Sequence, residues 1–353
     1  MQYHSTRNKT ISISSAEAIK KGLSAEGGLF VPETIPAVGY EEIKSLAEKS
    51  YQERAFFILS KFLTDFTAEE LQGCIEKAYT TEKFGTANIA PVYKLNAQNY
   101  FLELWHGPTC AFKDMALQIL PHLLTTSMKK TKEDCEVVIL VATSGDTGKA
   151  ALEGFRDVDG TRIVVFYPNH GVSEIQKLQM VTQEGNNVSV AAVKGNFDDA
   201  QSGVKKIFTD ADYENLLARN HFKLSSANSI NWGRLVPQIV YYFSAYADML
   251  AGGEIKCGEK INIVVPTGNF GNILAAYYAS RMGLPVNKFI CASNENNVLT
   301  DFISTGVYNK NRDFHTTISP SMDILISSNL ERFLYELTDK DDKLVAEWMK
   351  ALN

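Results

Sequence analysis

A lysine beside an aspartate is the first feature of the sequence that could carry out chemistry. Lys113 lies in residues 106–114, HGPTCAFKD, where a loop is predicted to become a helix. Most of its neighbours are small or apolar. An amine that loses contact with water gives up its proton more readily, so it can act as a nucleophile or a base, for instance through a Schiff base. The alternative is a solvated surface lysine, which is the commoner role of a lysine beside an aspartate.

A glycine-bearing loop at residues 266–272, PTGNFGN, separates a strand-like apolar run from a helical pattern. Its glycines let a ligand approach the backbone closely, and the N-terminus of the following helix offers free N–H groups and a partial positive charge. The loop contains no Lys or Arg, so backbone amides would hold a phosphate there. A tight strand-to-helix turn without a ligand is the alternative.

A second turn of this kind is TSGDTGKA at residues 143–150. The nucleotide-binding P-loop needs glycine at position 143 and serine or threonine at position 150, where this chain has threonine and alanine, so a magnesium–nucleotide site is disfavoured. The side chains of Ser144, Asp146 and Thr147 would suit a small polar ligand. Capping of the following helix by these same side chains is the alternative.

A third polar segment is SSANSINWGR at residues 225–234. It combines hydroxyls, amides and one arginine, Arg234, and a guanidinium pairs well with phosphate. The segment would therefore suit an anionic group of a substrate. The alternative is a polar loop that caps the helix expected to begin near Arg234.

Apolar periodicity predicts the elements that must position these residues. Residues 136–142 form a nearly continuous apolar run, which is typical of a strand buried on both faces. Strands alternate with helices through short connections, which indicates an α/β fold with largely parallel sheets and ligands at the carboxyl ends of the strands. The expected strands are 100–104, 136–142, 162–167, 188–193, 261–266 and 288–292, and the expected helices are a short one capped by Ser14 and Glu17, then 40–62, 67–79, 112–124, from the turn at 143–148 to 156, 173–184, 235–250 and 273–281.

Composition disfavours several classes of protein. The 353 residues, 45% of them hydrophobic, are enough for two domains with sizeable cores. Lys and Arg number 35 against 41 Asp and Glu, and the net charge of −6 argues against a nucleic-acid binder with a broad basic surface. The five cysteines contain no CxxC and the histidines show no metal-ligand spacing, so we expect neither a disulfide framework nor a metal site. No apolar run approaches the ~18 residues of a membrane span, and the N-terminus is polar, so a soluble cytoplasmic protein is expected.

Taken together, these segments resemble the threonine synthases, which are pyridoxal-phosphate enzymes of fold type II, the tryptophan synthase β-like superfamily. The resemblance extends from residue 3 to about residue 325. The segments that carry it are YHSTRNKTISISSAEAIKKGLSAEGGLFVPETIP (3–36), LELWHGPTCAFKDMALQ (102–118), ATSGDTGKAALEGF (142–155), SSANSINWGR (225–234) and PTGNFGNILAAYYA (266–279).

The resemblance implies a role for each candidate site residue. Lys113 would hold pyridoxal 5'-phosphate as a Schiff base and act as the catalytic base. Asp146 would lie near the phenolic oxygen of the cofactor, where relatives carry an asparagine. The cofactor phosphate would be held by Gly268, Asn269, Phe270, Gly271 and Asn272. The carboxylate of the substrate would be bound by Ser144 and Thr147, and its phosphate by Asn228, Ser229 and Arg234.

The implied reaction converts O-phospho-L-homoserine and water to L-threonine and phosphate, by γ-elimination followed by β-addition of water. The implied fold has two parallel-sheet α/β domains around a cofactor cleft, in a monomer or homodimer. Residues 1–97 would form an N-terminal region, 98–135 with 231–353 the large domain that binds the cofactor, and 136–230 a small mobile domain.

Two other functions remain open. One is a related lyase acting on phosphoserine, phosphothreonine or a similar substrate, and the other is a catalytically silent protein that still binds the cofactor. The chain ends at Asn353, before stretches that family members carry. We therefore expect the large domain to lack its C-terminal part, from which relatives supply the group near the pyridine nitrogen.

Overall fold

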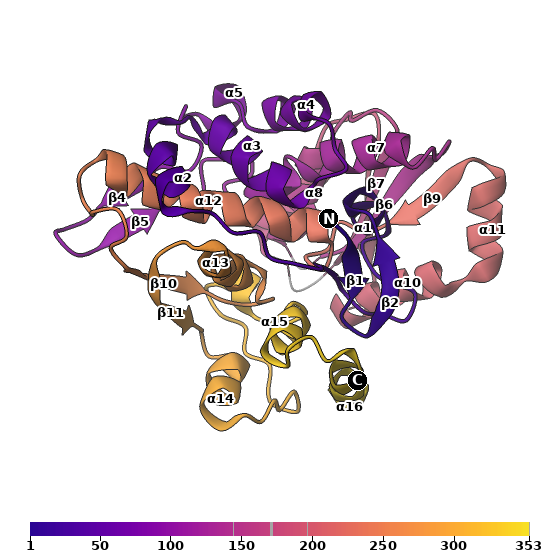
Figure 1. Ribbon diagram of the computed structural model, residues 1–353. Coiled ribbons are helices and arrows are strands. Elements are labelled where there is room, and N and C mark those ends of the chain that lie inside the picture. Colours follow the sequence, from indigo (N-terminus) through magenta and orange to yellow (C-terminus); the bar gives the residue numbers. More distant parts are fainter. Residues whose placement is uncertain (144, 170–171, 196, 353) are drawn as a thin grey trace.

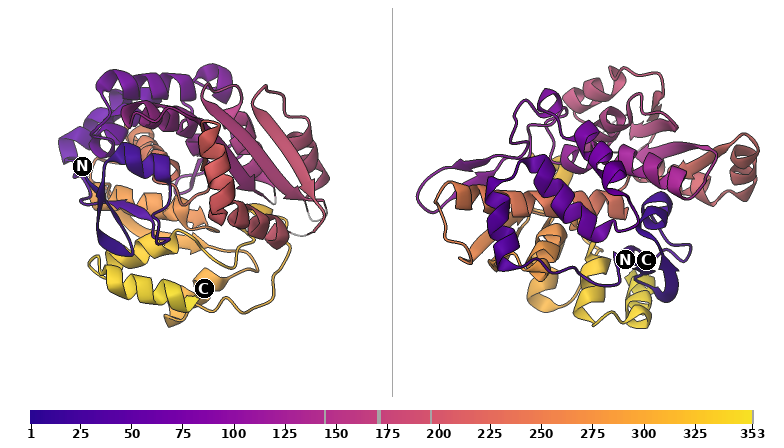
Figure 2. Two further views of the ribbon diagram at one scale, coloured as in Figure 1. Left: turned by 90° about the vertical axis from the view of Figure 1, so that its right-hand side faces the viewer. Right: turned by 45° about the horizontal axis from the view of Figure 1, so that its top comes forward.

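The computed structural model describes residues 1–143, 145–169, 172–195 and 197–352, and Figure 1 shows how their elements are arranged. A four-stranded parallel sheet occupies the middle of the sequence, with strand order β8-β7-β6-β9. The left view of Figure 2 shows this sheet on one side of the molecule. Three of its strands confirm the predictions, whereas β9 is short, half-exposed and not revealed by periodicity. The strands are β6 (Glu136–Ala142), β7 (Thr161–Pro168), β8 (Val188–Val193) and β9 (Phe222–Ser225).

Helices connect the strands of this sheet. α8 packs against β7, α9 packs against α8, and α10 contacts both β6 and β7. α8 and α9 confirm the predicted helices, although α9 ends three residues earlier than expected, and α10 and α11 are additional. Their bounds are α8 (Asp146–Phe155), α9 (Glu174–Val181), α10 (Phe197–Thr209) and α11 (Ala211–Arg219).

A second parallel sheet has two strands, β10 and β11, joined by the crossover helix α13. Beside it runs α12, the longest helix described, which contacts α13, α3 and α6. Most side chains of α12 are buried on every side, as expected for a helix that is apolar all round. All four elements lie where they were predicted: α12 (Trp232–Ala251), β10 (Ile261–Pro266), α13 (Gly271–Met282) and β11 (Val286–Ala292).

The N-terminal part begins with a small antiparallel sheet in the order β2-β1-β3 and the predicted short helix α1, which Ser14 and Glu17 close with a reciprocal capping box. The helical pattern over 40–62 is not one helix. Ser50 caps a new helix there by accepting from the N–H of Glu53. The elements are β1 (Tyr3–Ser5), β2 (Asn8–Ile13), α1 (Ser15–Lys21), β3 (Phe30–Pro32), α2 (Tyr40–Ser45), η1 (Leu46–Glu48), α3 (Tyr51–Phe62), α4 (Ala68–Ala78), α5 (Thr81–Phe84), β4 (Val92–Lys94) and β5 (Tyr100–Leu102).

The predicted helix 112–124 is also divided, into α6 (Asp114–Leu117) and α7 (Leu120–Lys130). Pro121 lies in the first turn of α7 and has no N–H to donate to the carbonyl of Leu117, four residues earlier. The break leaves that carbonyl facing α8. There, Gly154 approaches it so closely that an added Cβ would lie 2.1 Å from the oxygen.

The C-terminal helices return to the N-terminal sheet. α16 contacts β2, and the N–H of Lys9 donates to the carboxylate of Asp342. Glu331 on α15 accepts two hydrogen bonds from the guanidinium of Arg7, at 2.9 and 2.7 Å. The elements of this part are α14 (Val298–Thr305), η2 (Pro320–Met322), α15 (Leu330–Leu337) and α16 (Asp342–Leu352).

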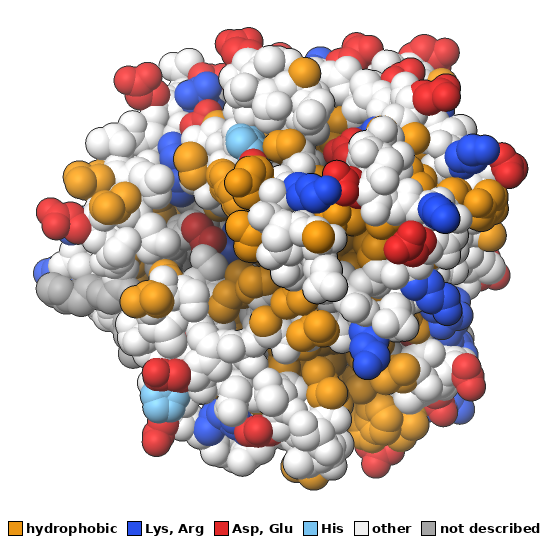
Figure 3. Space-filling view, turned by 90° about the vertical axis from the view of Figure 1, so that its left-hand side faces the viewer, with side chains coloured by type: hydrophobic (Ala, Val, Ile, Leu, Met, Phe, Trp, Pro, Cys, Tyr) orange, Lys and Arg blue, Asp and Glu red, His pale blue; other side chains and the backbone are white. Residues whose placement is uncertain are grey.

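Apolar side chains gather near the centre of the face that carries the β4–β5 hairpin and the β10–β11 pair (Figure 3). Tyr93 and Phe101 are opposite one another in the hairpin, and Val264 and Ile290 are opposite one another in the parallel pair; all four are largely exposed. Each of these small sheets thus leaves one face uncovered by the described residues. None of the helices in the described part of the chain is both long and apolar enough to cross a membrane.

Candidate active site

Two of the predicted site segments meet at Lys113. The residue is at the N-terminus of α6 and only 8% exposed. Its Nζ lies 2.7 Å from Oδ2 of Asp146, the first residue of α8, and 4.9 Å from the centroid of the Phe112 ring. The amine is therefore shielded from water and directed at a carboxylate from a different element.

The carboxylate of Asp146 accepts from a second donor, Ser321, which the sequence did not predict to be a site residue. Burial alone would raise the pKa of Asp146, but the ammonium of Lys113 and the hydroxyl of Ser321, which also donates to Oδ2, together hold it below its usual value. The site thus contains a carboxylate that stays charged at neutral pH, paired with the one lysine that was singled out.

The loop before α8 is closed by Thr143. Its hydroxyl oxygen accepts hydrogen bonds of 3.0 Å from the N–H groups of Gly145 and Gly148. This hydroxyl supplies the capping that was the alternative role of Asp146 and Thr147. Thr147 is half-buried in the first turn of α8, and Ser144 lies outside the described residues.

The loop between β10 and α13 has the geometry of an anion cradle. Phe270 has a φ of +65°, a left-handed conformation that turns the backbone into the helix. Among the described residues, no acceptor receives the backbone N–H groups of residues 268–272, which remain available to a ligand. A Cβ on Gly268 would lie only 3.1 to 3.3 Å from Ile324, Ser321 and Met322.

Two side chains of this loop, those of Phe270 and Asn272, are held by contacts inside the protein. The ring of Phe270 is buried against Phe333, with 5.5 Å between centroids. The carboxamide oxygen of Asn272 accepts hydrogen bonds from the phenols of Tyr241 and Tyr242 on α12, at 2.5 and 2.6 Å. Phe270 and Asn272 could therefore bind a phosphate through their backbone N–H groups but not through their side chains.

Arg234 is the most unusual residue of the 225–234 segment. It is buried, its Nη1 donates to the carbonyl of Ala227, and its Nε has no partner among the described residues. Burial lowers the pKa of Arg234 to about 10, an effect that the negative charge of Asp146 opposes. A buried guanidinium with an unused donor is suited to an anion. Asn228, by contrast, is exposed, and Ser229 is half-buried.

Residues 319–332, here called the C-terminal connection, tie the predicted segments together. The Ser327 hydroxyl donates to the carbonyl of Gly268 at 2.6 Å, and the Asn329 N–H donates to the carbonyl of Asn269 at 3.0 Å. The Asn329 carboxamide also donates to the carbonyl of Ser229 at 3.1 Å. This connection was not predicted from the sequence. The pattern that could have revealed it is two serines and an asparagine, SSN at 327–329, directly before an amphipathic helix.

Arg332 fixes this connection from inside the protein. Its side chain is fully buried and donates to the carbonyls of Phe30 and Ile230, at 3.0 and 2.6 Å, and to Oδ1 of Asn329 at 2.6 Å. One side chain thus links the N-terminal sheet, the 225–234 segment and the connection.

Asp114, next to Lys113, is fully buried. It accepts hydrogen bonds of 2.8 Å from both the N–H and the hydroxyl of Thr109. Burial nevertheless raises its pKa to about 6. Through its two hydrogen bonds with Thr109, Asp114 holds the loop that precedes Lys113 against the start of α6.

We expect Asp114 to make the folded protein less stable as the pH rises through about 6. The folded state holds this proton to a higher pH than the unfolded chain does, so its stabilising contribution is complete below pH ~4 and lost above the folded pKa. The difference of about two pKa units corresponds to about 3 kcal/mol. Free energies of unfolding measured between pH 4 and 8 should therefore converge or cross for the wild type and Asp114→Asn. Parallel curves would contradict the prediction.

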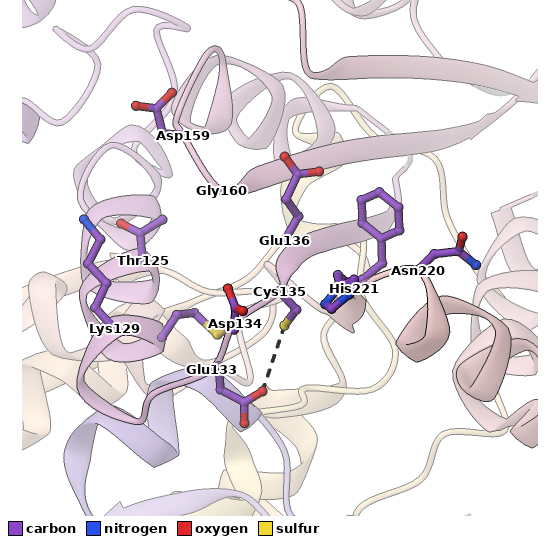
Figure 4. Close-up of a pocket in the computed structure, with 12 residues that line it drawn as sticks. Thr125, Lys129, Glu133, Asp134, Cys135, Glu136, Asp159, Gly160, Asn220 and His221 are labelled. Carbon is purple, nitrogen blue, oxygen red and sulfur yellow. Dashed lines mark hydrogen bonds between the residues drawn. The ribbon is translucent and has the colours of Figure 1, made fainter.

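The cavity shown in Figure 4 is a different place. It has a volume of about 620 Å³ and lies where β6, β7 and β9 begin, whereas Thr143 and Asp146 follow the carboxyl end of β6. Its lining includes Lys129, Cys135 and His221. None of the buried side-chain atoms that lack a partner in the described part of the chain belongs to a lining residue. In parallel sheets ligands bind at the carboxyl ends, so the cavity is not the candidate site.

Comparison with known proteins shows two family matches. Residues 2–79 match the family described as "Threonine synthase N terminus", and residues 87–352 match "Pyridoxal-phosphate dependent enzyme". The chain is 46% identical over 347 residues to human "Threonine synthase-like 1", covering 96% of this chain and 46% of that protein. It therefore spans about half the length of that relative. With the threonine synthase of Pseudomonas aeruginosa the identity is 42% over 352 residues, covering 99% of this chain and 72% of the relative.

Solved structures show the same similarity. The pyridoxal-phosphate-bound threonine synthase of Brucella melitensis superposes with a TM-score of 0.91 at 39% identity, covering all of this chain and 73% of that one. The threonine synthase of Escherichia coli superposes with a TM-score of 0.81 at 32% identity, covering 97% of this chain and 76% of that one. The fold described above is thus similar to that of these fold-type II enzymes.

Proposed function

Because the chain belongs to the threonine synthase family of pyridoxal-phosphate-dependent enzymes, we propose that it converts O-phospho-L-homoserine and water to L-threonine and phosphate. The observation that supports this reaction best is the pairing of buried Lys113 with Asp146 beside the anion cradle at 268–272. The proposed substrate carries both an amino group for the cofactor and a phosphate for the buried guanidinium of Arg234.

The residues at the site fit pyridoxal phosphate. Lys113 offers the aldehyde a shielded amine, and the backbone N–H groups of 268–272 offer the phosphate donors that no described residue uses. A side chain at Gly268 would press against Ser321, Met322 and Ile324 of the C-terminal connection, which packs directly on the loop. The fit rests on backbone donors and one amine. No cluster of potential metal ligands is found among the described residues.

The chemistry divides between the cofactor and the chain. When bound, pyridoxal phosphate withdraws electrons from the α-carbon of an attached amino acid. The amine of Lys113 removes the Cα proton and then a Cβ proton, and it returns protons to Cγ and Cα. Phosphate leaves Cγ after the Cβ proton is removed and before Cγ is protonated. Water adds at Cβ before Cα is protonated, and the proton that the water gives up balances the charge of the released phosphate, so the products are threonine and phosphate. Asp146 keeps the amine in place, since its carboxylate lies 2.7 Å from Nζ.

We propose Arg234, Ser229 and Asn228 for the substrate phosphate and Ser144 with Thr147 for the substrate carboxylate. Arg234 is the best supported of these, because its Nε is buried without a partner. We also propose that residues 136–230 close over the substrate as a small domain, which their separate four-stranded sheet supports. Closure would keep water from reaching intermediates early.

A second candidate is a lyase that acts on a related phospho-amino acid. This candidate is supported by the 46% identity with the human protein named "Threonine synthase-like 1", a name that differs from threonine synthase. The residues around Lys113 would serve both reactions. A chain that binds the cofactor without turnover is the third possibility.

The decisive experiment incubates the purified chain with pyridoxal phosphate and O-phospho-L-homoserine and measures threonine and phosphate together. Equal release of both supports the proposed synthase. Phosphate with a keto acid in place of threonine indicates the lyase. A visible spectrum of bound cofactor without any turnover indicates the silent binder.

A further inference from the structure

The hydroxyl of Ser321 joins the C-terminal connection to the carboxylate of Asp146. It donates to Oδ2, the same oxygen that Lys113 contacts at 2.7 Å. Asp146 belongs to α8, beside the four-stranded sheet, whereas Ser321 belongs to η2, which follows the β10–β11 pair. The contact therefore crosses between the two parallel-sheet parts of the protein, at the carboxylate that faces the lysine.

The position of Ser321 is itself fixed by a buried polar network around Asp323. Oδ1 of Asp323 accepts from the carboxamide of Asn294 at 2.7 Å and from the hydroxyl of Thr317 at 2.7 Å, and Oδ2 accepts from the N–H of Thr317 at 2.9 Å. Asn296 donates to the same carboxylate at 3.1 Å. Both asparagines follow the carboxyl end of β11, so the turn that carries Ser321 is anchored to that strand.

The carboxylate of Asp146 forms its ion pair with Lys113, and no ion pair joins it to Arg234 among the described residues. The carboxylate of Asp146 can rotate about its Cβ–Cγ bond. A second donor to Oδ2, the oxygen that Lys113 contacts, favours the rotamer in which that oxygen faces the lysine. Ser321 is such a donor.

We propose that Ser321 is a positioning residue, which holds the Asp146 carboxylate against the amine of Lys113 and so sets the orientation of the lysine toward the cofactor. The inference rests on the proposed function of Lys113 as the residue that binds pyridoxal phosphate. It assigns to the C-terminal connection a direct part in the site, beyond its contacts with the 268–272 loop.

The test uses the full chain loaded with pyridoxal phosphate and follows the visible absorption of the bound cofactor as the pH is lowered. Loss of the hydroxyl in Ser321→Ala removes a donor to the carboxylate, so Asp146 takes up its proton at higher pH. We expect the acid midpoint to rise by about one unit and kcat to fall about tenfold, with KM little changed, as for a lost hydrogen bond to a charged group. Ser321→Thr keeps the hydroxyl and should restore both.

Further variants keep the test decisive. Asp323→Asn should shift the midpoint in the same direction as Ser321→Ala, because it loosens the turn. Ser304→Ala removes a hydroxyl that donates to the carbonyl of Thr300 on its own helix, and it should behave as the wild type. Thermal midpoints of the cofactor-free variants show whether each one folds.

A spectrum of Ser321→Ala that titrates as the wild type does, while Asp146→Asn changes it, would overturn the proposal. So would a shift that Ser321→Thr fails to restore in a protein that folds normally. If the wild type binds the cofactor but releases no threonine, the proposed function fails, yet the spectral titration still decides the role of Ser321.

Discussion

Replacement of Lys113 with alanine is expected to abolish turnover and the visible absorption of bound cofactor, while the fold survives. Lys113 is the buried amine of the site, and removal of a catalytic base alone costs about 10²- to 10⁴-fold in rate. Loss of the covalent attachment adds to this, so we expect a fall in kcat of at least ~10³-fold. Product assays and absorption spectra after dialysis measure the two effects separately.

Two control variants separate chemistry from charge. Lys113→Arg retains a cation beside Asp146 but has no amine that can attack an aldehyde, so it should be as inactive as Lys113→Ala while keeping more of its stability. Lys130→Ala breaks an ion pair of 2.8 Å with Glu70 at the C-terminal end of α7 and should leave turnover unchanged. Activity retained by Lys113→Ala would refute the assignment of the catalytic lysine.

Replacement of Gly154 with alanine is expected to destabilise the protein strongly, although it adds only one methyl group. The added carbon would lie 2.1 Å from the carbonyl oxygen of Leu117, and backbone cannot rotate aside as a side chain can. α8 must therefore move away from α6, at a cost of about 3 kcal/mol. Thermal or denaturant unfolding measures the loss.

The same movement should weaken the site, because α8 carries Asp146 and Lys113 directly precedes α6. We expect Gly154→Ala to retain less cofactor on dialysis than the wild type does. Gly73→Ala is the matched control, since Gly73 is inside α4 with nothing within 4 Å of an added Cβ. That variant should be more stable by up to ~1 kcal/mol, because alanine favours the helix. Equal stability losses in the two variants would contradict the role assigned to the Leu117 contact.

Local sequence patterns were sufficient for the elements that carry strong periodicity. The apolar runs at 136–142, 188–193 and 261–266 are strands with those bounds. The comparisons confirm the α/β fold class and the cofactor that the family resemblance implied. Patterns were insufficient where a single residue interrupts a helix, as Pro121 does between α6 and α7, because the apolar spacing continues across the break.

The candidate site was only partly accessible to such patterns. Lys113 and the 268–272 loop were each singled out from their own segment, because a lysine among small and apolar residues and a glycine-bearing turn are patterns with recognisable chemistry. Ser321 has no such signal, since its only distinguishing property is contact with a carboxylate 175 positions earlier in the chain. A pairing across that distance depends on how two sheets are placed relative to one another, and this is a property of the whole fold.

The C-terminal connection has a consequence for the order in which the protein matures during synthesis. The 268–272 loop and Asp146 leave the ribosome long before Ser321, Asn329 and Arg332, which hold them in place. A nascent chain lacking these last residues has the lysine but not the arrangement around it. Stable loading with pyridoxal phosphate should accordingly be a late event, which occurs after translation has passed Arg332.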